Sequence, residues 1–184
     1  MAASVYAQLA CATYPRVKAI DPNYILIGAS ENVYVSTWRT WLDDIYKNGF
    51  SRCNDGVSFH NYDDPNTGTN NKFDQLRATM TAYGDGNKPV WLTEFGASTC
   101  NGTIQSLGCY TEQGQASKLV AVINWLKQSY PWIKAAIVYG DNDIPSLMTT
   151  DNKEASFGVY RTNTSGAVTT AKAAVAALRS LYGL

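Results

Sequence analysis

Four short runs of apolar residues alternate with stretches whose apolar positions recur at helical spacing. The runs occupy residues 24–28, 56–62, 89–96 and 134–140 and are hydrophobic almost without interruption. Continuous hydrophobicity of this kind is typical of strands that are covered on both faces in a parallel sheet. Successive runs begin roughly 30 to 45 residues apart, which suits strand–helix–strand units.

Around the runs, apolar residues recur mostly three and four positions apart, which predicts amphipathic helices. Five such stripes occur: Val5, Leu9, Ala12 and Val17; Trp38, Trp41, Leu42 and Ile45; Phe73, Leu76 and Met80; Leu119, Val120, Ile123 and Leu126; and Val168, Ala171, Val175, Leu178 and Leu181. Gly84 and Gly86 are expected to end the helix before the third run. We therefore predict an α/β fold, one domain over residues 1–184 with four parallel strands alternating with helices.

Composition and charge exclude several classes of function. In the 184 residues, 15 Lys and Arg balance 15 Asp and Glu, so there is no basic surface for nucleic acid or for anionic lipid. No apolar run is long enough to span a membrane, and the first residues lack the features of a signal peptide. The single histidine, His60, argues against a histidine-rich metal site. We expect no metal, cofactor, nucleic-acid or membrane partner.

Polar side chains gather where the second and third runs end. His60 and Tyr62 end the second run, and their spacing puts them on one face of a strand. In the third run Glu94 shares one face of the strand with Val90 and Leu92. Trp91 and Thr93, which lie between them, are expected to turn toward the helices. A carboxylate held ionised by a phenol and an imidazole suits a nucleophile or a general base. From the spacing alone, a structural carboxylate explains Glu94 equally well.

The long polar loops follow strand ends, where parallel α/β sheets bind ligands. They cover residues 63–71 and 100–111, and Cys100 and Cys109 bracket the second. A disulfide between these two cysteines would contribute roughly 2–3 kcal/mol and would indicate an oxidising, extracellular or particle-associated location. Cys11 and Cys53 are expected to be buried free thiols.

Two motifs carry a resemblance to a known family. Residues 89–98, PVWLTEFGAS, resemble the seventh-strand motif of retaining glycoside hydrolases with (β/α)8 barrels, the cellulase-like superfamily called clan A. Residues 57–62, VSFHNY, resemble the sixth strand of that family, and the similarity extends along nearly the whole chain. The resemblance implies that Glu94 is the nucleophile, that Tyr62 is its hydrogen-bond partner and that His60 binds sugar.

The chain also departs from that family. A complete barrel typically takes ~250 residues, and only four strands are predicted here. The resemblance therefore implies half of a (β/α)8 TIM barrel, strands five to eight, without the fourth strand that carries the family's Asn–Glu acid/base pair. Val138 stands where the family usually has a tryptophan at the eighth strand.

Half a barrel would leave its first and last strands unpaired, and such edges recruit partners. A symmetric homodimer, or a complementary half-barrel chain, would close the ring. In a closed dimer, Asp141 or Asp143 of the partner subunit would approach Glu94 and supply the missing acid; a solvated loop is the alternative interpretation of these aspartates. At the same rim, Glu31 and Tyr139 are expected to bind substrate.

Three hypotheses follow for the whole chain. The first is a glycoside hydrolase acting on an oligosaccharide or polysaccharide, complete only after assembly. The second is a weakly active or inactive glycan-binding or structural module of a larger assembly. The intact Thr-Glu-Phe-Gly and His-x-Tyr motifs favour the first, whereas the absent acid strand and Val138 favour the second. The third is that the chain is a fragment of a longer enzyme.

Overall fold

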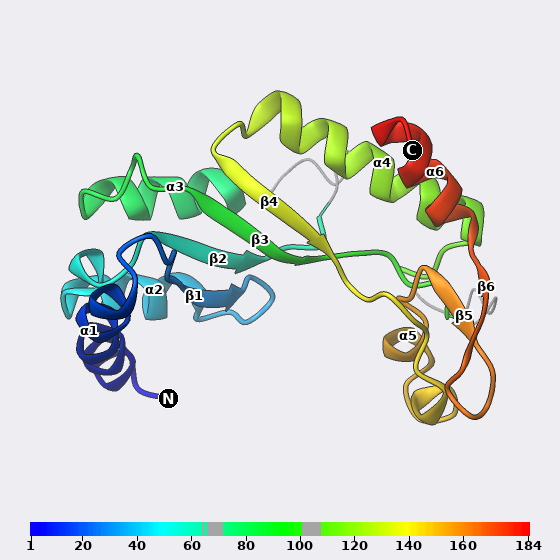
Figure 1. Cartoon of the computed structure of the whole chain (residues 1–184), viewed down its shortest axis with the longest axis horizontal. Coiled ribbons are helices and arrows are strands. Elements are labelled where there is room, and N and C mark those ends of the chain that lie inside the picture. The colour runs from blue at the N-terminus through cyan, green and yellow to red at the C-terminus, as the bar shows by residue number, and fades with distance from the viewer. Residues whose placement is uncertain (64, 66–71, 101–107) are drawn as a thin grey trace. The chain divides into compact units, whose positions relative to one another are not determined.

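The computed structural model describes residues 1–63, 65, 72–100 and 108–184, without the side chain of Glu31. The predicted loops at 63–71 and 100–111 fall largely outside these residues. Figure 1 traces the elements in chain order. The first part alternates helices and strands: α1 (Ala3–Ile20), β1 (Ile27–Asn32), α2 (Trp38–Lys47), η1 (Phe50–Arg52), β2 (Gly56–His60), α3 (Lys72–Ala82), β3 (Val90–Phe95), α4 (Glu112–Ser129) and β4 (Ile133–Val138). It is followed by η3 (Pro145–Leu147), α5 (Asn152–Ala155), β5 (Tyr160–Thr162), β6 (Val168–Ala171) and α6 (Ala173–Tyr182).

The four predicted strands form one sheet. Their spatial order is β1-β2-β3-β4, the same as their order in the sequence. β1 pairs with β2 in parallel, with Ile27 opposite Gly56 and Asn32 opposite His60. The prediction of four parallel strands alternating with helices is confirmed, and β1 and β4 are the edge strands of this sheet.

The chain divides into two compact units. The first comprises Met1–Asn61, Gly68–Thr93 and Tyr130–Ala136, and the second comprises Tyr62–Thr67, Glu94–Ser129 and Ile137–Leu184. Strands β3 and β4 begin in the first unit and end in the second. Glu94 is therefore the first residue of β3 that belongs to the second unit.

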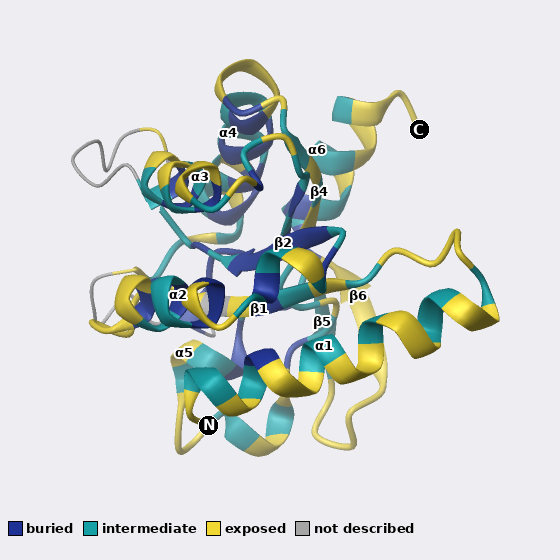
Figure 2. Ribbon diagram, turned by 90° about the vertical axis from the view of Figure 1, so that its left-hand side faces the viewer, coloured by how far each residue is buried: buried dark blue, intermediate teal, exposed yellow. Residues whose placement is uncertain are grey.

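The core of the first unit lies between the sheet and its helices. Val57 and Phe59 of β2 are completely buried, and the Phe59 ring packs against Trp38 of α2 and Phe73 of α3, with centroids 5.5 and 5.7 Å away. Figure 2 shows this burial in dark blue on β2 and on one side of α2 and of α3. The predicted apolar stripes of α2 and α3 supply most of this core.

The predicted facing of β3 is wrong. Val90 and Leu92 are completely buried, whereas Trp91 and Thr93 are half-buried. The first pair therefore lies on the covered face of the sheet, where the prediction had placed the second. The alternation breaks at the end of the strand, where Glu94 is half-buried and Phe95 is buried.

The beginning of the chain also differs from the prediction. Only Ala7 of α1 is buried, and Val5 and Leu9 from the predicted stripe are 51% and 56% exposed. The first strand starts at Ile27 instead of residue 24, and residues 24–26 belong to neither a helix nor a strand. The amide of Leu26 donates to the side chain of Asp55 and is therefore not available to the sheet.

The second unit contains α4, the β5–β6 hairpin and α6. α4 buries Leu119, Val122, Ile123 and Leu126, close to the predicted stripe. Val168 and Ala171, predicted in the last helix, belong instead to β6, which pairs antiparallel with β5. The hairpin turn explains the difference, since the Asn163 side chain accepts from the Ser165 and Ala167 amides. Among the described residues, none of the helices combines the length and the apolar character of a membrane span.

Candidate active site

A tyrosine and a glutamate from the two predicted motifs meet in the second unit. Tyr62 follows β2, and Glu94 lies near the end of β3. The Tyr62 hydroxyl donates to Glu94 Oε2 at 2.9 Å. Both residues are half-buried. The structure thus brings together the pair that the resemblance implied.

The environment of Tyr62 fixes the direction of this hydrogen bond. Burial raises the pKa of Tyr62 far above its ordinary value, and the hydrogen bond to Glu94 and nearby negative charge raise it further. Tyr62 therefore keeps its proton over the physiological pH range and remains the donor. Glu94 is the acceptor of this bond, and the bond orients its carboxyl group.

Three aromatic rings stand beside this carboxylate. Tyr62 and Tyr139 each pack near-perpendicular to Phe157, with centroids 5.6 and 5.4 Å apart, and lie 6.4 Å from each other. Gly96 makes this approach possible, because a Cβ there would lie 2.6 Å from the Tyr139 carbonyl oxygen and 3.1 Å from Phe157 Cδ1. Tyr139, one of the predicted substrate-binding residues, is therefore at the site.

A second carboxylate, which the sequence did not reveal, lies next to Tyr139. The Tyr139 hydroxyl donates to Oε1 of Glu154 on the short helix α5. This hydrogen bond, with burial, raises the pKa of Tyr139 to about 12. The Asp151 side chain caps α5 by accepting from the Glu154 amide at 2.9 Å. One helical turn is too short to show an apolar period, so the sequence pattern gave no sign of this helix.

Helix α4 holds both sides of the site in place. The amide nitrogen of Gln115, a completely buried side chain, donates to the carbonyls of Ala97, Phe157 and Gly158 at 2.9, 3.1 and 3.1 Å. One turn further along, Lys118 Nζ donates to the carbonyl of Tyr62 at 2.9 Å. The backbone that follows Glu94 and the backbone that carries Phe157 are therefore tied to one helix.

The other predicted sugar-binding residues belong to the first unit. His60 Nε2 lies 3.2 Å from the Ser30 hydroxyl. The backbone before Glu31 is irregular, with φ angles of 78° at Ala29 and 47° at Ser30. The side chain of Glu31 lies outside the described residues, so its role and that of His60 stay predictions.

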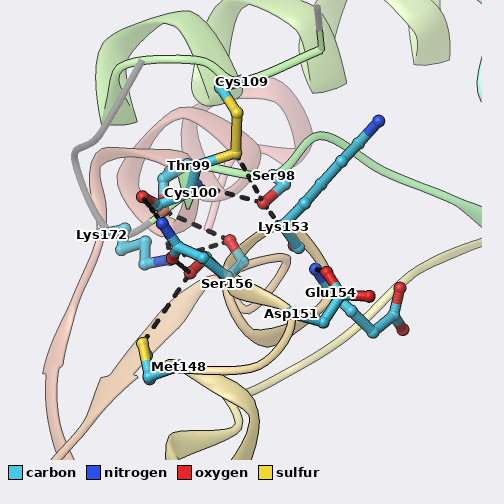
Figure 3. The surroundings of a disulfide bond; sticks show 11 residues. Ser98, Thr99, Cys100, Cys109, Met148, Asp151, Lys153, Glu154, Ser156 and Lys172 are labelled. Carbon is cyan, nitrogen blue, oxygen red and sulfur yellow. Dashed lines mark hydrogen bonds between the residues drawn. A yellow bond between two sulfur atoms is a disulfide. The ribbon is translucent and has the colours of Figure 1, made fainter. Parts of the chain in front are cut away.

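The structure gives Asp143 a different environment from the predicted one. Its side chain is 8% exposed and forms an ion pair with Lys172, which is 2% exposed, at 2.7 Å. Lys172 also donates to Thr99 Oγ1 at 3.0 Å and to the Ser156 carbonyl at 3.3 Å (Figure 3). Asp143 is therefore a buried carboxylate and not part of a solvated loop, and its role as an acid supplied by a partner stays a prediction. Asp141 is exposed, and its role stays a prediction.

All four cysteines form disulfides. The structure contains the predicted Cys100–Cys109 bond, shown in Figure 3. The prediction of free thiols at Cys11 and Cys53 is wrong, because these residues form a second disulfide. It joins α1 to the residue that follows η1, two segments whose proximity the sequence pattern does not show. Within the described residues, no three His, Cys, Asp or Glu side chains gather where they could hold a metal ion.

The sequence of the chain matches a known family of glycosyl hydrolases. Residues 1–170 match the family model described as glycosyl hydrolase catalytic core. The chain belongs to this family. Comparison with curated protein sequences gave no match.

Solved glycosidase structures share the fold of this family member. A GH2 β-galacturonidase from Eisenbergiella tayi aligns with a TM-score of 0.63 and 15% identity over 96% of this chain and 30% of its own. The family 51 α-L-arabinofuranosidase AbfB from Bifidobacterium longum gives 0.62 and 14% over 92% and 38%. A β-glucuronidase from Faecalibacterium prausnitzii gives 0.56 and 18% over 94% and 27%. The chain thus spans about a third of these structures and has the fold of a partial TIM-barrel-like domain.

Proposed function

We propose that the chain provides the nucleophile side of a retaining glycoside hydrolase site that acts on an oligosaccharide or polysaccharide. The observation that carries the proposal is the 2.9 Å hydrogen bond from Tyr62 to Glu94, beside aromatic rings suited to packing on a sugar. Membership in the glycosyl hydrolase catalytic core family supports it. Two disulfides are compatible with an extracellular location.

Glu94 would act in two steps. Its carboxylate attacks the anomeric carbon while the bond from that carbon to the leaving-group oxygen breaks, which gives a glycosyl ester. The leaving oxygen takes a proton from a general acid, or departs as a stable anion. Water then adds to the anomeric carbon and gives up a proton, and Glu94 is released as a carboxylate. Tyr62 holds one carboxylate oxygen throughout.

We propose that the general acid comes from a partner chain. Glu154 accepts a hydrogen bond from Tyr139, and Asp143 is paired with Lys172. We propose that a second copy, or a complementary half-barrel, pairs with the edge strands β1 and β4 and brings its own carboxyl within ~5–5.5 Å of Glu94. Asp141 of the partner subunit is the candidate in a symmetric homodimer. Sedimentation as a stable monomer would exclude that dimer.

The test of the nucleophile is hydrolysis of dinitrophenyl glycosides, whose leaving group needs no acid. We expect wild-type protein to release dinitrophenolate and Glu94→Gln to lose the activity by several orders of magnitude. Glu112→Gln is the matched control and should retain the activity. Glu112 lies on α4, and its carboxylate is paired with Arg161. Equal rates for wild type and Glu94→Gln would refute the assignment. Sugar binding without any release would favour the glycan-binding module instead.

A further inference from the structure

Two carboxylates and two phenols surround one site, and all four present hydrogen-bond acceptors. Tyr62 donates its only hydroxyl proton to Glu94, and Tyr139 donates its only one to Glu154. An ionised carboxylate has no proton to donate, and each phenol has spent the one it has. Toward a ligand these four side chains can therefore act only as hydrogen-bond acceptors. A ligand that fits them must bring hydrogen-bond donors.

The negative charge of the site also favours a ligand that brings hydrogen-bond donors. Glu94 and Glu154 both raise the pKa of both phenols, so each carboxylate acts on both tyrosines. The rings of Tyr62 and Tyr139 lie within 6.4 Å of each other and share Phe157 as a neighbour, which places the two carboxylates around one aromatic cluster. Half-buried charges are screened less than exposed ones, so this negative potential reaches a bound ligand.

We infer that Glu154 selects the substrate class: the site takes a neutral, hydroxyl-bearing sugar and rejects a sugar acid. The hydroxyls of a neutral sugar donate to the acceptors around Glu94. The carboxylate of a uronic acid is itself an acceptor and would meet two like charges. Glu154 is a specificity-determining residue, and the inference rests on the proposed function of Glu94.

The negative charge of Glu154 can be removed without removing its hydrogen bond to Tyr139. In Glu154→Gln, the side-chain amide oxygen can still accept from Tyr139, so the ring stays in place while the charge is removed. Glu112→Gln removes one negative charge from the same unit, at the ion pair with Arg161, and is the matched control. Any change specific to Glu154→Gln therefore reports on charge at the site.

The experiment compares pairs of dinitrophenyl glycosides that differ only in CH2OH or carboxylate at one ring carbon, in both anomeric forms. We expect wild type to prefer the neutral member by about 100-fold in kcat/KM, Glu154→Gln to reduce that preference about tenfold, and Glu112→Gln to leave it unchanged. Raising the salt concentration from 0.05 to 1 M should narrow the wild-type preference, because salt shortens the range of the repulsion.

The outcomes separate the two proposals. Equal or better hydrolysis of the uronide by wild type, with Glu94→Gln inactive, would overturn the inference and leave the nucleophile in place. A wild-type preference that neither salt nor Glu154→Gln changes would also overturn it. If wild type hydrolyses no member of any pair, the proposed function is wrong and the inference falls with it.

Discussion

The buried ion pair between Asp143 and Lys172 makes a sharp prediction about stability. The two side chains are 8% and 2% exposed and 2.7 Å apart. In Asp143→Asn the lysine would keep only neutral acceptors: the new amide oxygen, the Thr99 hydroxyl and the Ser156 carbonyl. Breaking a buried pair in this way costs about 3–5 kcal/mol, because the remaining charge is neither solvated nor neutralised.

The same reasoning predicts that the loss is reversible by a second substitution. In Asp143→Leu with Lys172→Met, both charges are gone and apolar side chains of similar size remain, so the free energy of unfolding should return to within ~1 kcal/mol of wild type. Asp44→Asn, in an exposed pair with Lys47, is the control and should leave the unfolding midpoint unchanged.

The assay is equilibrium unfolding in urea, followed by circular dichroism. With m unchanged, the 3–5 kcal/mol loss for Asp143→Asn appears as a lower midpoint, and in a thermal scan as a fall of roughly 10 °C. An unchanged midpoint for Asp143→Asn, or a double variant as unstable as the single one, would refute the reasoning. If the double variant is stable but no longer hydrolyses the activated glycoside, Asp143 or Lys172 has a role in hydrolysis.

Three further predictions concern other parts of the chain. Asp55 is partly buried, which alone would raise its pKa, but hydrogen bonds led by the one from Lys18 lower the pKa overall. Its stabilising effect should be present above the unfolded pKa of ~3.9 and be lost as the pH falls through the folded pKa. The difference in urea midpoint between wild type and Asp55→Asn should therefore vanish in acid. Replacing both Cys11 and Cys53 by serine opens a loop between residues 42 apart and should cost about 4 kcal/mol in the same assay. Tyr62→Phe should lower kcat on the activated glycoside about 10²-fold with an unchanged circular dichroism spectrum, and an unchanged kcat would show that Tyr62 does not position the nucleophile.

The parts of the fold that the sequence predicted well are those where burial dominates. Phe59 and Leu92 lie in continuous apolar runs whose side chains are fully buried, so hydrophobicity marks those strands correctly. At the edge of the sheet the same signal fails, because Tyr24 and Ile25 are apolar yet 53% and 63% exposed. The β5–β6 hairpin was missed because Val168 is apolar at helical spacing but exposed, and the turn residues before it were the better signal.

The candidate site divides in a similar way. Tyr62 and Glu94 stand in local motifs, so the sequence predicted their meeting. Glu154 contributes through one contact with Tyr139, fifteen positions away in the chain, and no periodicity encodes such a contact. The burial of Asp143 was not predicted, because its partner, Lys172, becomes adjacent only when the chain folds.

The two disulfides have a consequence for oxidative refolding. Four thiols can pair in three ways, and here each native bond stays within one compact unit, Cys11–Cys53 in the first and Cys100–Cys109 in the second. Both incorrect arrangements would cross-link one unit to the other. Peptide mapping without reduction would therefore recognise every scrambled isomer by a single hybrid peptide, which makes the homogeneity of a recombinant preparation simple to verify.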